Sequence, residues 1–179
     1  MMTAVEAEVP ANPLASPVSR ILIAVVRVGV ALMWIQNVAW KRPPDFGRAA
    51  DNGLYFWAGQ AVEYPVLPPY SWFVETLFLP NIEFVGWIIL LVEGGLGAFL
   101  LIGLATRLWA VVGMAQTVAI ALSVLNAPHE WHWAYYLMFL AHLALFAVAA
   151  GRCYGVDGVL RPIWLRSDTR FARTMRSLS

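Results

Sequence analysis

This chain is poor in cysteine and in charged residues. Cys153 is the only cysteine among 179 residues, so the chain can form no internal disulfide and no cysteine-rich metal site. Only 13% of the residues are charged, about half the share that is usual in soluble domains. The formal net charge is +1, and no run of lysine and arginine is interleaved with aromatic residues, which argues against nucleic acid as a partner. Because a single cysteine can form neither a dithiol nor a cysteine-rich metal site, a redox role would need an electron carrier from another molecule.

Hydrophobic residues, in contrast, make up 60% of the chain. They gather in four runs, and each run is close to the ~20 residues that a transmembrane helix needs. The predicted helices cover, approximately, residues 20–41, 82–104, 107–127 and 131–150. We therefore predict an all-α membrane protein whose residues 19–151 form a four-helix transmembrane bundle, with the lipid bilayer as its first partner.

The segments outside these runs differ from one another in composition. Residues 1–18 carry prolines and glutamates without an apolar run, which predicts a disordered tail. Residues 152–179 form an Arg-rich tail. Residues 43–81, between the first and second helices, form a long loop rich in aromatic residues and proline, which we expect at the membrane interface. Two interpretations of this loop stay open, an interfacial collar and a lid over a site between the helices.

The distribution of basic residues predicts the orientation of the bundle. Eight of them fall on the side shared by both termini: Arg20, Arg107, Arg152, Arg161, Arg166, Arg170, Arg173 and Arg176. Three fall on the other side: Lys41, Arg42 and Arg48. Because basic residues concentrate on the cytoplasmic side, we expect both the N-terminus and the C-terminus in the cytoplasm and the loop 43–81 outside.

Each predicted helix brings one polar side chain to a similar depth in the membrane. Arg27, Glu93, Gln116 and His142 form this intramembrane polar layer. At 1.5 Å per residue, Arg27 and Glu93 come close enough to meet. Charged groups at such depth normally face protein or water. Two interpretations stay open: an ion pair that fixes the register of the helices, or a site that handles protons or a quinone headgroup.

A second polar group is predicted near the outer surface, among aromatic residues. Its members are Trp34, Asn37, Lys41, Asn126, His129 and His132. Apolar walls with one or two hydrogen-bond donors suit a quinone, so this group is a candidate quinone site. His129 and His132 are too few to predict a zinc site without a third ligand.

Short motifs stand at the ends of the predicted helices. The most specific is a glutamate followed by glycines and a tight turn, Glu93-Gly94-Gly95-Leu96-Gly97 and then Leu101-Ile102-Gly103-Leu104-Ala105-Thr106-Arg107. The others are Arg27-Val28-Gly29, Lys41, Gly151-Arg152 and Tyr154-Gly155-Val156-Asp157. From Arg27 to about Leu160 this set resembles the DoxX-like membrane proteins, which are related to the DoxD subunit of thiosulfate:quinone oxidoreductase.

The resemblance implies a four-helix protein of the bacterial or archaeal plasma (inner) membrane. We therefore expect a multi-pass subunit of a quinone-linked oxidoreductase or of an oxidative- or thiol-stress complex. It would have protein partners and no redox centre of its own, and quinone is the expected cofactor, with no metal or haem. We assign no catalytic residue and expect an accessory subunit rather than a stand-alone enzyme. Two alternatives stay open: a non-enzymatic scaffold that anchors partner proteins, and a proton-coupled transporter.

Overall fold

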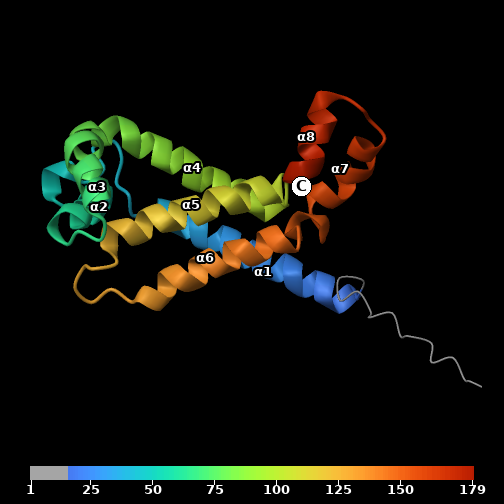
Figure 1. The fold of residues 1–179 in the computed structure, drawn as a ribbon, viewed down its shortest axis with the longest axis horizontal. Helices are drawn as coiled ribbons and strands as arrows, with labels where there is room; N and C mark the ends of the chain where they lie inside the picture. The colour runs from blue at the N-terminus through green and yellow to red at the C-terminus, as the bar shows by residue number, and fades with distance from the viewer. Residues whose placement is uncertain (1–15) are drawn as a thin grey trace, which may run out of the picture.

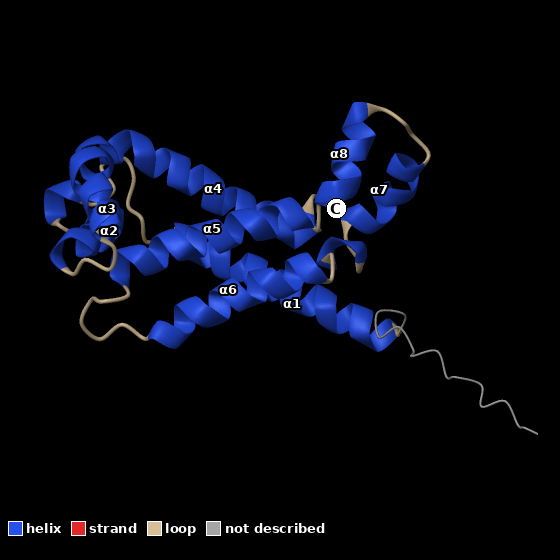
Figure 2. Cartoon of the chain, viewed as in Figure 1, coloured by secondary structure: helices blue, strands red, loops and turns tan. Residues whose placement is uncertain are grey.

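Four long helices form the body of the molecule. The structure, a computed structural model, describes residues 16–179. The long helices are α1 (Pro17–Val38), α4 (Ile82–Ile102), α5 (Thr106–Val124) and α6 (His132–Ala147). They run along the long axis of the molecule (Figure 1), and Figure 2 shows only helices and connections in the described part of the chain. The predicted all-α class is confirmed.

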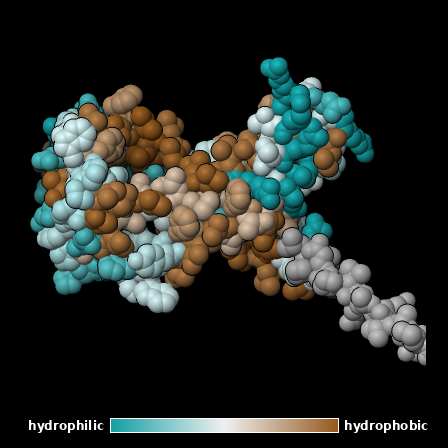
Figure 3. Space-filling model, viewed as in Figure 1, coloured by the Kyte–Doolittle hydropathy of each residue, from teal (hydrophilic) through white to brown (hydrophobic). Residues whose placement is uncertain are grey.

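The middle of the molecule is apolar and its two ends are polar, as the brown and teal surfaces of Figure 3 show. Three helical stretches are long and apolar enough to cross a membrane: α1, the stretch Pro68–Ile102, and α5. The helix α6 is apolar but has only 16 residues, a length of roughly 24 Å against about 30 Å of hydrocarbon. It ends before the predicted residue 150 because Ala149 adopts a left-handed conformation with φ 48°, which stops an α-helix.

The segment between α1 and α4 is helical, which corrects the prediction of a loop over residues 43–81. It contains a short 3-10 turn (Arg48–Ala50), α2 (Gly53–Glu63), α3 (Pro68–Phe73), a π-helical turn (Val74–Phe78) and a 3-10 turn (Leu79–Asn81). On α2, the buried residues Leu54, Ala58 and Ala61 repeat at a spacing of four and three, so one face packs on the bundle. This segment caps one end of the molecule (Figure 1).

The opposite end is also folded. After a 3-10 turn (Ala150–Arg152), α7 (Val156–Leu165) and α8 (Arg170–Leu178) pack against each other, and Trp164 and Ala172 are buried. The predicted Arg-rich tail over residues 152–179 is therefore largely helical. Of the predicted N-terminal tail, residues 1–15 lie outside the described residues, and Pro17 already begins α1. The start of α1 and the C-terminus lie at this same end (Figure 1).

The long helices pack as two pairs, α1 with α4 and α5 with α6. The pairs meet in a core of Val30, Ala31, Trp34, Leu96, Leu100, Ala110, Leu145 and Ala150. This core occupies the half of the bundle nearer to α7 and α8. Toward α2 and α3 the pairs enclose a cavity, which is the candidate site.

Candidate functional site

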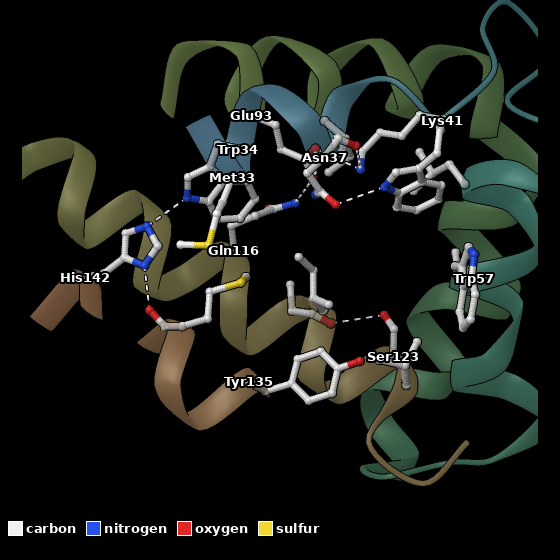
Figure 4. Close-up of a pocket in the computed structure, with 18 of the residues that line it drawn as sticks. Met33, Trp34, Asn37, Lys41, Trp57, Glu93, Gln116, Ser123, Tyr135 and His142 are labelled. Atoms are coloured by element: carbon white, nitrogen blue, oxygen red, sulfur yellow. Dashed lines mark hydrogen bonds and ion pairs between the residues drawn. The ribbon is translucent and has the colours of Figure 1, made fainter. Parts of the chain in front are cut away.

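A cavity of about 590 Å³ lies between α1, α4, α5 and α6 and is closed at one end by the segment that holds α2 and α3. Figure 4 shows it with α1 on one side, α6 on the other and α2 at the end. Its volume falls within the range of about 300–1,000 Å³ that is usual for small-ligand sites. The polar side chains that line it are Asn37, Lys41, Glu93, Gln116, Ser123, Glu130, Tyr135 and His142.

An ion pair lies at the polar end of this cavity. Lys41 Nζ is 2.8 Å from Glu93 Oε2, and each side chain is only 1% exposed. The amide of Asn37 donates to Glu93 Oε2 at 3.2 Å, and the amide of Gln116 donates to Oε1 at 3.1 Å. Lys41 Nζ also donates to the carbonyl oxygen of Asn37 at 3.2 Å. The carboxylate is thus both charge-paired and hydrogen-bonded, as a buried carboxylate requires.

Lys41 reaches Glu93 because α1 ends at Val38, three residues earlier than predicted. The chain then turns back, and Asp45 stabilises this turn by accepting hydrogen bonds from the backbone of Gly47 and Ala49, each at 3.2 Å. The bonds from Ala49 and Gly47 hold the pKa of the Asp45 carboxyl below its usual range, since they favour its charged form. The turn leaves the Lys41 ammonium directed into the bundle rather than toward the surface.

Aromatic rings wall the cavity around the ion pair. The ammonium of Lys41 lies 4.0 Å from the ring centroid of Trp40, within the range of a cation–π contact. The indole N–H of Trp40 donates to Asn37 Oδ1 at 2.9 Å, which fixes the orientation of that amide. Trp57 on α2 contributes a further wall (Figure 4). The ion pair thus lies among aromatic walls, and further polar side chains, Ser123, Glu130, Tyr135 and His142, line other parts of the cavity.

Gln116 keeps unused hydrogen-bonding capacity in this environment. A glutamine amide has two N–H donors and one carbonyl acceptor, and one N–H of Gln116 is committed to Glu93. Among the described residues, its second N–H and its carbonyl oxygen have no protein partner. Because the Lys41–Glu93 pair has no net charge, the end of the cavity around it suits an uncharged ligand with a hydrogen-bonding group.

His142 is held in one position by hydrogen bonds to both ring nitrogens. Its Nε2 accepts from the indole N–H of Trp34 at 2.8 Å, so its Nδ1 carries the proton that is donated to the carbonyl of Met138 at 2.7 Å. The ring is fully buried and packs against Gly113, where a Cβ would collide with it. His142 is thus a neutral wall of the cavity that ties α1 to α6.

Arg27 lies outside the cavity, which corrects the prediction that it meets Glu93. Its guanidinium donates to three backbone carbonyls at the start of the C-terminal segment, those of Ala150 at 3.2 Å, Cys153 at 3.1 Å and Tyr154 at 3.2 Å. Arg27 and Glu93 were predicted to meet because they lie at a similar depth. Arg27 instead bonds to the backbone carbonyls that follow α6, which lie near the end of the bundle where α1 begins. Lys41, entering from the other end, neutralises Glu93 instead.

Glycines and an aspartate complete the arrangement around Arg27. A Cβ at Gly103 or Gly155 would collide with the guanidinium. Asp157, fully buried, accepts from the backbone N–H groups of Ala105 at 2.8 Å and Thr106 at 2.9 Å, and so caps the N-terminus of α5. Most of the motifs quoted for the family resemblance meet here. They hold the fold together at the end of the bundle opposite the cavity.

The structure does not keep the two predicted polar groups apart, because members of both line the same cavity. Trp34, Asn37 and Lys41 of the predicted outer group and Glu93, Gln116 and His142 of the predicted inner layer line one cavity. Three predicted members of the outer group do not line it: Asn126, His129 and His132. The amide of Asn126 donates to the carbonyl of Pro65 at 2.9 Å, and both histidines are exposed, because α6 begins only at His132 and their connection lies at the surface.

Several lining residues had no signal in the sequence that set them apart. Tyr70, on α3, donates to the carbonyl of Ala119 at 3.0 Å and lies 3.0 Å from Ser123 Oγ. The hydroxyl of Tyr135 donates to Glu130. Tyr70 belongs to the aromatic segment that was predicted to be either a collar or a lid, and Tyr135 shares the helical face of His142, which was the one available hint. Within residues 16–179, no group of three or more His, Cys, Asp and Glu is arranged to hold a metal ion.

The comparison with known families agrees with the positions of the motifs. The family model described as "TQO small subunit DoxD" matches residues 22–170, which covers α1 from its sixth residue, the other three long helices, the segment with α2 and α3, and α7. No curated protein and no solved structure matches the chain.

Proposed function

This chain belongs to the DoxD family, and from that premise we propose that it is the membrane subunit of a quinone-linked oxidoreductase complex that binds the quinone ring in the cavity beside Lys41 and Glu93. A partner subunit supplies the redox centre, as expected for a chain with a single, buried cysteine. The quinone, when bound, supplies the two-electron, two-proton chemistry. The residues of this chain hold and orient it.

The observation that carries the proposal is the composition of the cavity. A quinone ring is flat and uncharged, with a carbonyl oxygen at each end. It is suited by apolar and aromatic walls with a few polar groups at fixed positions. Trp34, Trp40 and Trp57 line the cavity with aromatic surface, and Lys41, Glu93 and Gln116 form one cluster of polar groups in it. The second N–H of Gln116 is the group that donates a hydrogen bond to a quinone carbonyl oxygen in this site.

The Lys41–Glu93 ion pair lets polar groups line the site without adding a net charge. An unpaired lysine or glutamate at this depth would be costly, and either would bind an ion in preference to an uncharged ring. Paired at 2.8 Å, the two residues present dipoles without net charge. Asn37 and Gln116 hold the carboxylate from two different helices, so the polar end of the cavity keeps its shape.

We further propose that all four long helices cross the plasma membrane of a bacterium or archaeon, α6 with local thinning of the bilayer. Both termini then lie in the cytoplasm, with α7 and α8. The support is the excess of arginine at that end and the polar surfaces at both ends of the apolar middle (Figure 3). The cap with α2 and α3 then faces the outside, where its helices act as a lid over the cavity.

Quinone titration of the purified protein tests the proposal. We expect saturable binding of a short-chain ubiquinone analogue by isothermal calorimetry in detergent, and weaker binding after Gln116→Leu. Loss of one hydrogen bond at a buried site costs about 1–2 kcal/mol, or about 5- to 30-fold in Kd. Gln36→Leu is the matched control because Gln36 is exposed on α1 and does not line the cavity. No saturable binding to the wild-type chain, or equal Kd values for both variants, would reject the proposal.

A further inference from the structure

Exposed lining residues mark an opening of the cavity beside α1 and α2, which we call the mouth. The helices α1 and α6 are joined where Trp34 meets His142, and they separate from there toward the cap (Figure 1). Figure 4 looks into the cavity with α1 above and α6 below. The lining residues with the largest exposed fractions are Met33 at 54%, Trp57 at 40% and Trp40 at 37%. They mark the rim on the side of α1 and α2.

The mouth lies at the depth of lipid chains rather than of lipid headgroups. Met33 is five residues before the end of α1 at Val38, which places it roughly 8 Å inside that end. Met138, a lining residue on α6, is six residues after the start of that helix at His132, roughly 9 Å inside. A ligand in the cavity therefore meets hydrocarbon, not water, at this opening.

We infer that this mouth is a lateral portal through which the isoprenoid tail of a membrane quinone leaves the cavity between Met33 and Met138. The inference rests on the proposed function and adds where the tail lies. The ring contacts the polar end near Lys41, and the tail passes across the apolar side of the cavity into the bilayer. Methionine suits such a rim because its flexible, polarisable side chain adapts to a chain that offers no directional contacts.

The portal explains two features that ring binding alone does not require. The cavity is larger than one ring needs, and the lining residues Val30, Ile120, Met138 and Ala141 give it apolar surface that offers a ligand no hydrogen bond. The exposed Met33 stands beside the buried Trp34, so the wall of the cavity is interrupted at the surface that faces lipid.

The test compares two quinones and two tryptophan variants of the full chain in detergent. A tail-less methoxyquinone reports the ring site, and its decyl-tailed analogue reports the portal. Met33→Trp places a bulky ring in the mouth, and overpacking of this kind should weaken binding of the decyl analogue about tenfold. Binding of the tail-less quinone should weaken much less, so the ratio of the two Kd values should rise. Leu32→Trp is the control, because Leu32 is 51% exposed on the same helix and does not line the cavity.

The outcomes separate the two proposals. If the wild-type chain binds neither quinone, the proposed function fails and the portal with it. If both quinones bind but Met33→Trp affects them equally or not at all, the ring site stands and the portal is rejected. A second measurement covers the case of a misfolded variant: a quinone with a diazirine at the tail end should label the wild-type chain on residues adjoining Met33 or Met138. Label confined to other faces of the bundle overturns the portal.

Discussion

Replacing Lys41 by methionine should destabilise this protein more than any neutralisation of an exposed charge. At the observed separation of 2.8 Å, two unit charges attract each other by about 6 kcal/mol at an effective dielectric constant of about 20. Part of this is offset by the desolvation of both groups. Methionine has a similar length and no charge, so the variant leaves the Glu93 carboxylate buried with only the amides of Asn37 and Gln116 as partners. The net cost of breaking a buried pair in this way is about 3–5 kcal/mol.

Unfolding in mixed micelles, titrated with SDS and followed by circular dichroism, measures this cost. Arg42→Met is the matched control because it removes a positive charge from the adjacent, exposed residue. We expect it to change the free energy of unfolding by less than about 0.5 kcal/mol. The double variant Lys41→Met, Glu93→Gln removes both charges, so its cost should be less than the sum of the two single costs. Equal stability of the Lys41→Met and Arg42→Met variants, or strict additivity in the double variant, would refute the reasoning.

Three further variants test the contacts that hold the bundle. Gly155→Ala should cost about 1–3 kcal/mol in unfolding free energy, because its methyl group displaces the guanidinium of Arg27. Asp157→Ala should cost a similar amount by removing the cap of α5, and hydrogen exchange should rise first in the initial turn of that helix. Trp34→Phe leaves Nε2 of His142 buried without its donor and should cost about 1–3 kcal/mol by SDS titration. Unchanged stability in any of the three would contradict the role given to that contact.

The four long helices could be predicted from the sequence because their apolar runs are long and their ends carry strong signals. The turn at Gly103, for example, has φ 70°, a left-handed conformation that favours glycine. The cap was harder to predict. Its prolines predicted a division into short pieces, and Pro68 and Pro69 occupy the first turn of one of them, α3, where proline is tolerated. The buried face of α2 consists of only a few residues, so the sequence carries a weak helical pattern there.

The candidate site was predicted in part. Similar depth in the membrane grouped Glu93, Gln116 and His142 in one predicted layer, and all three line the cavity. The partner of Glu93 could not be predicted from depth, because depth along a helix says nothing about where a loop residue turns back. Lys41 lies beyond the end of α1, and only the turn that follows directs it to Glu93. Arg27 in turn bonds to carbonyls whose positions depend on the left-handed residues Ala149 and Tyr154, which no pattern in the sequence indicates.

Photo-labelling with a quinone that carries an azide on its ring tests the central claim most directly. The full chain in membrane vesicles is irradiated with this probe, with and without an excess of unlabelled quinone, and the labelled residues are identified by mass spectrometry. Binding of the ring beside the Lys41–Glu93 pair predicts saturable label on residues 33–41, at the end of α1 and just after it, or on residues 116–124 of α5, which the competitor removes. Label that does not saturate, or that falls only on α7 and α8, would contradict the account.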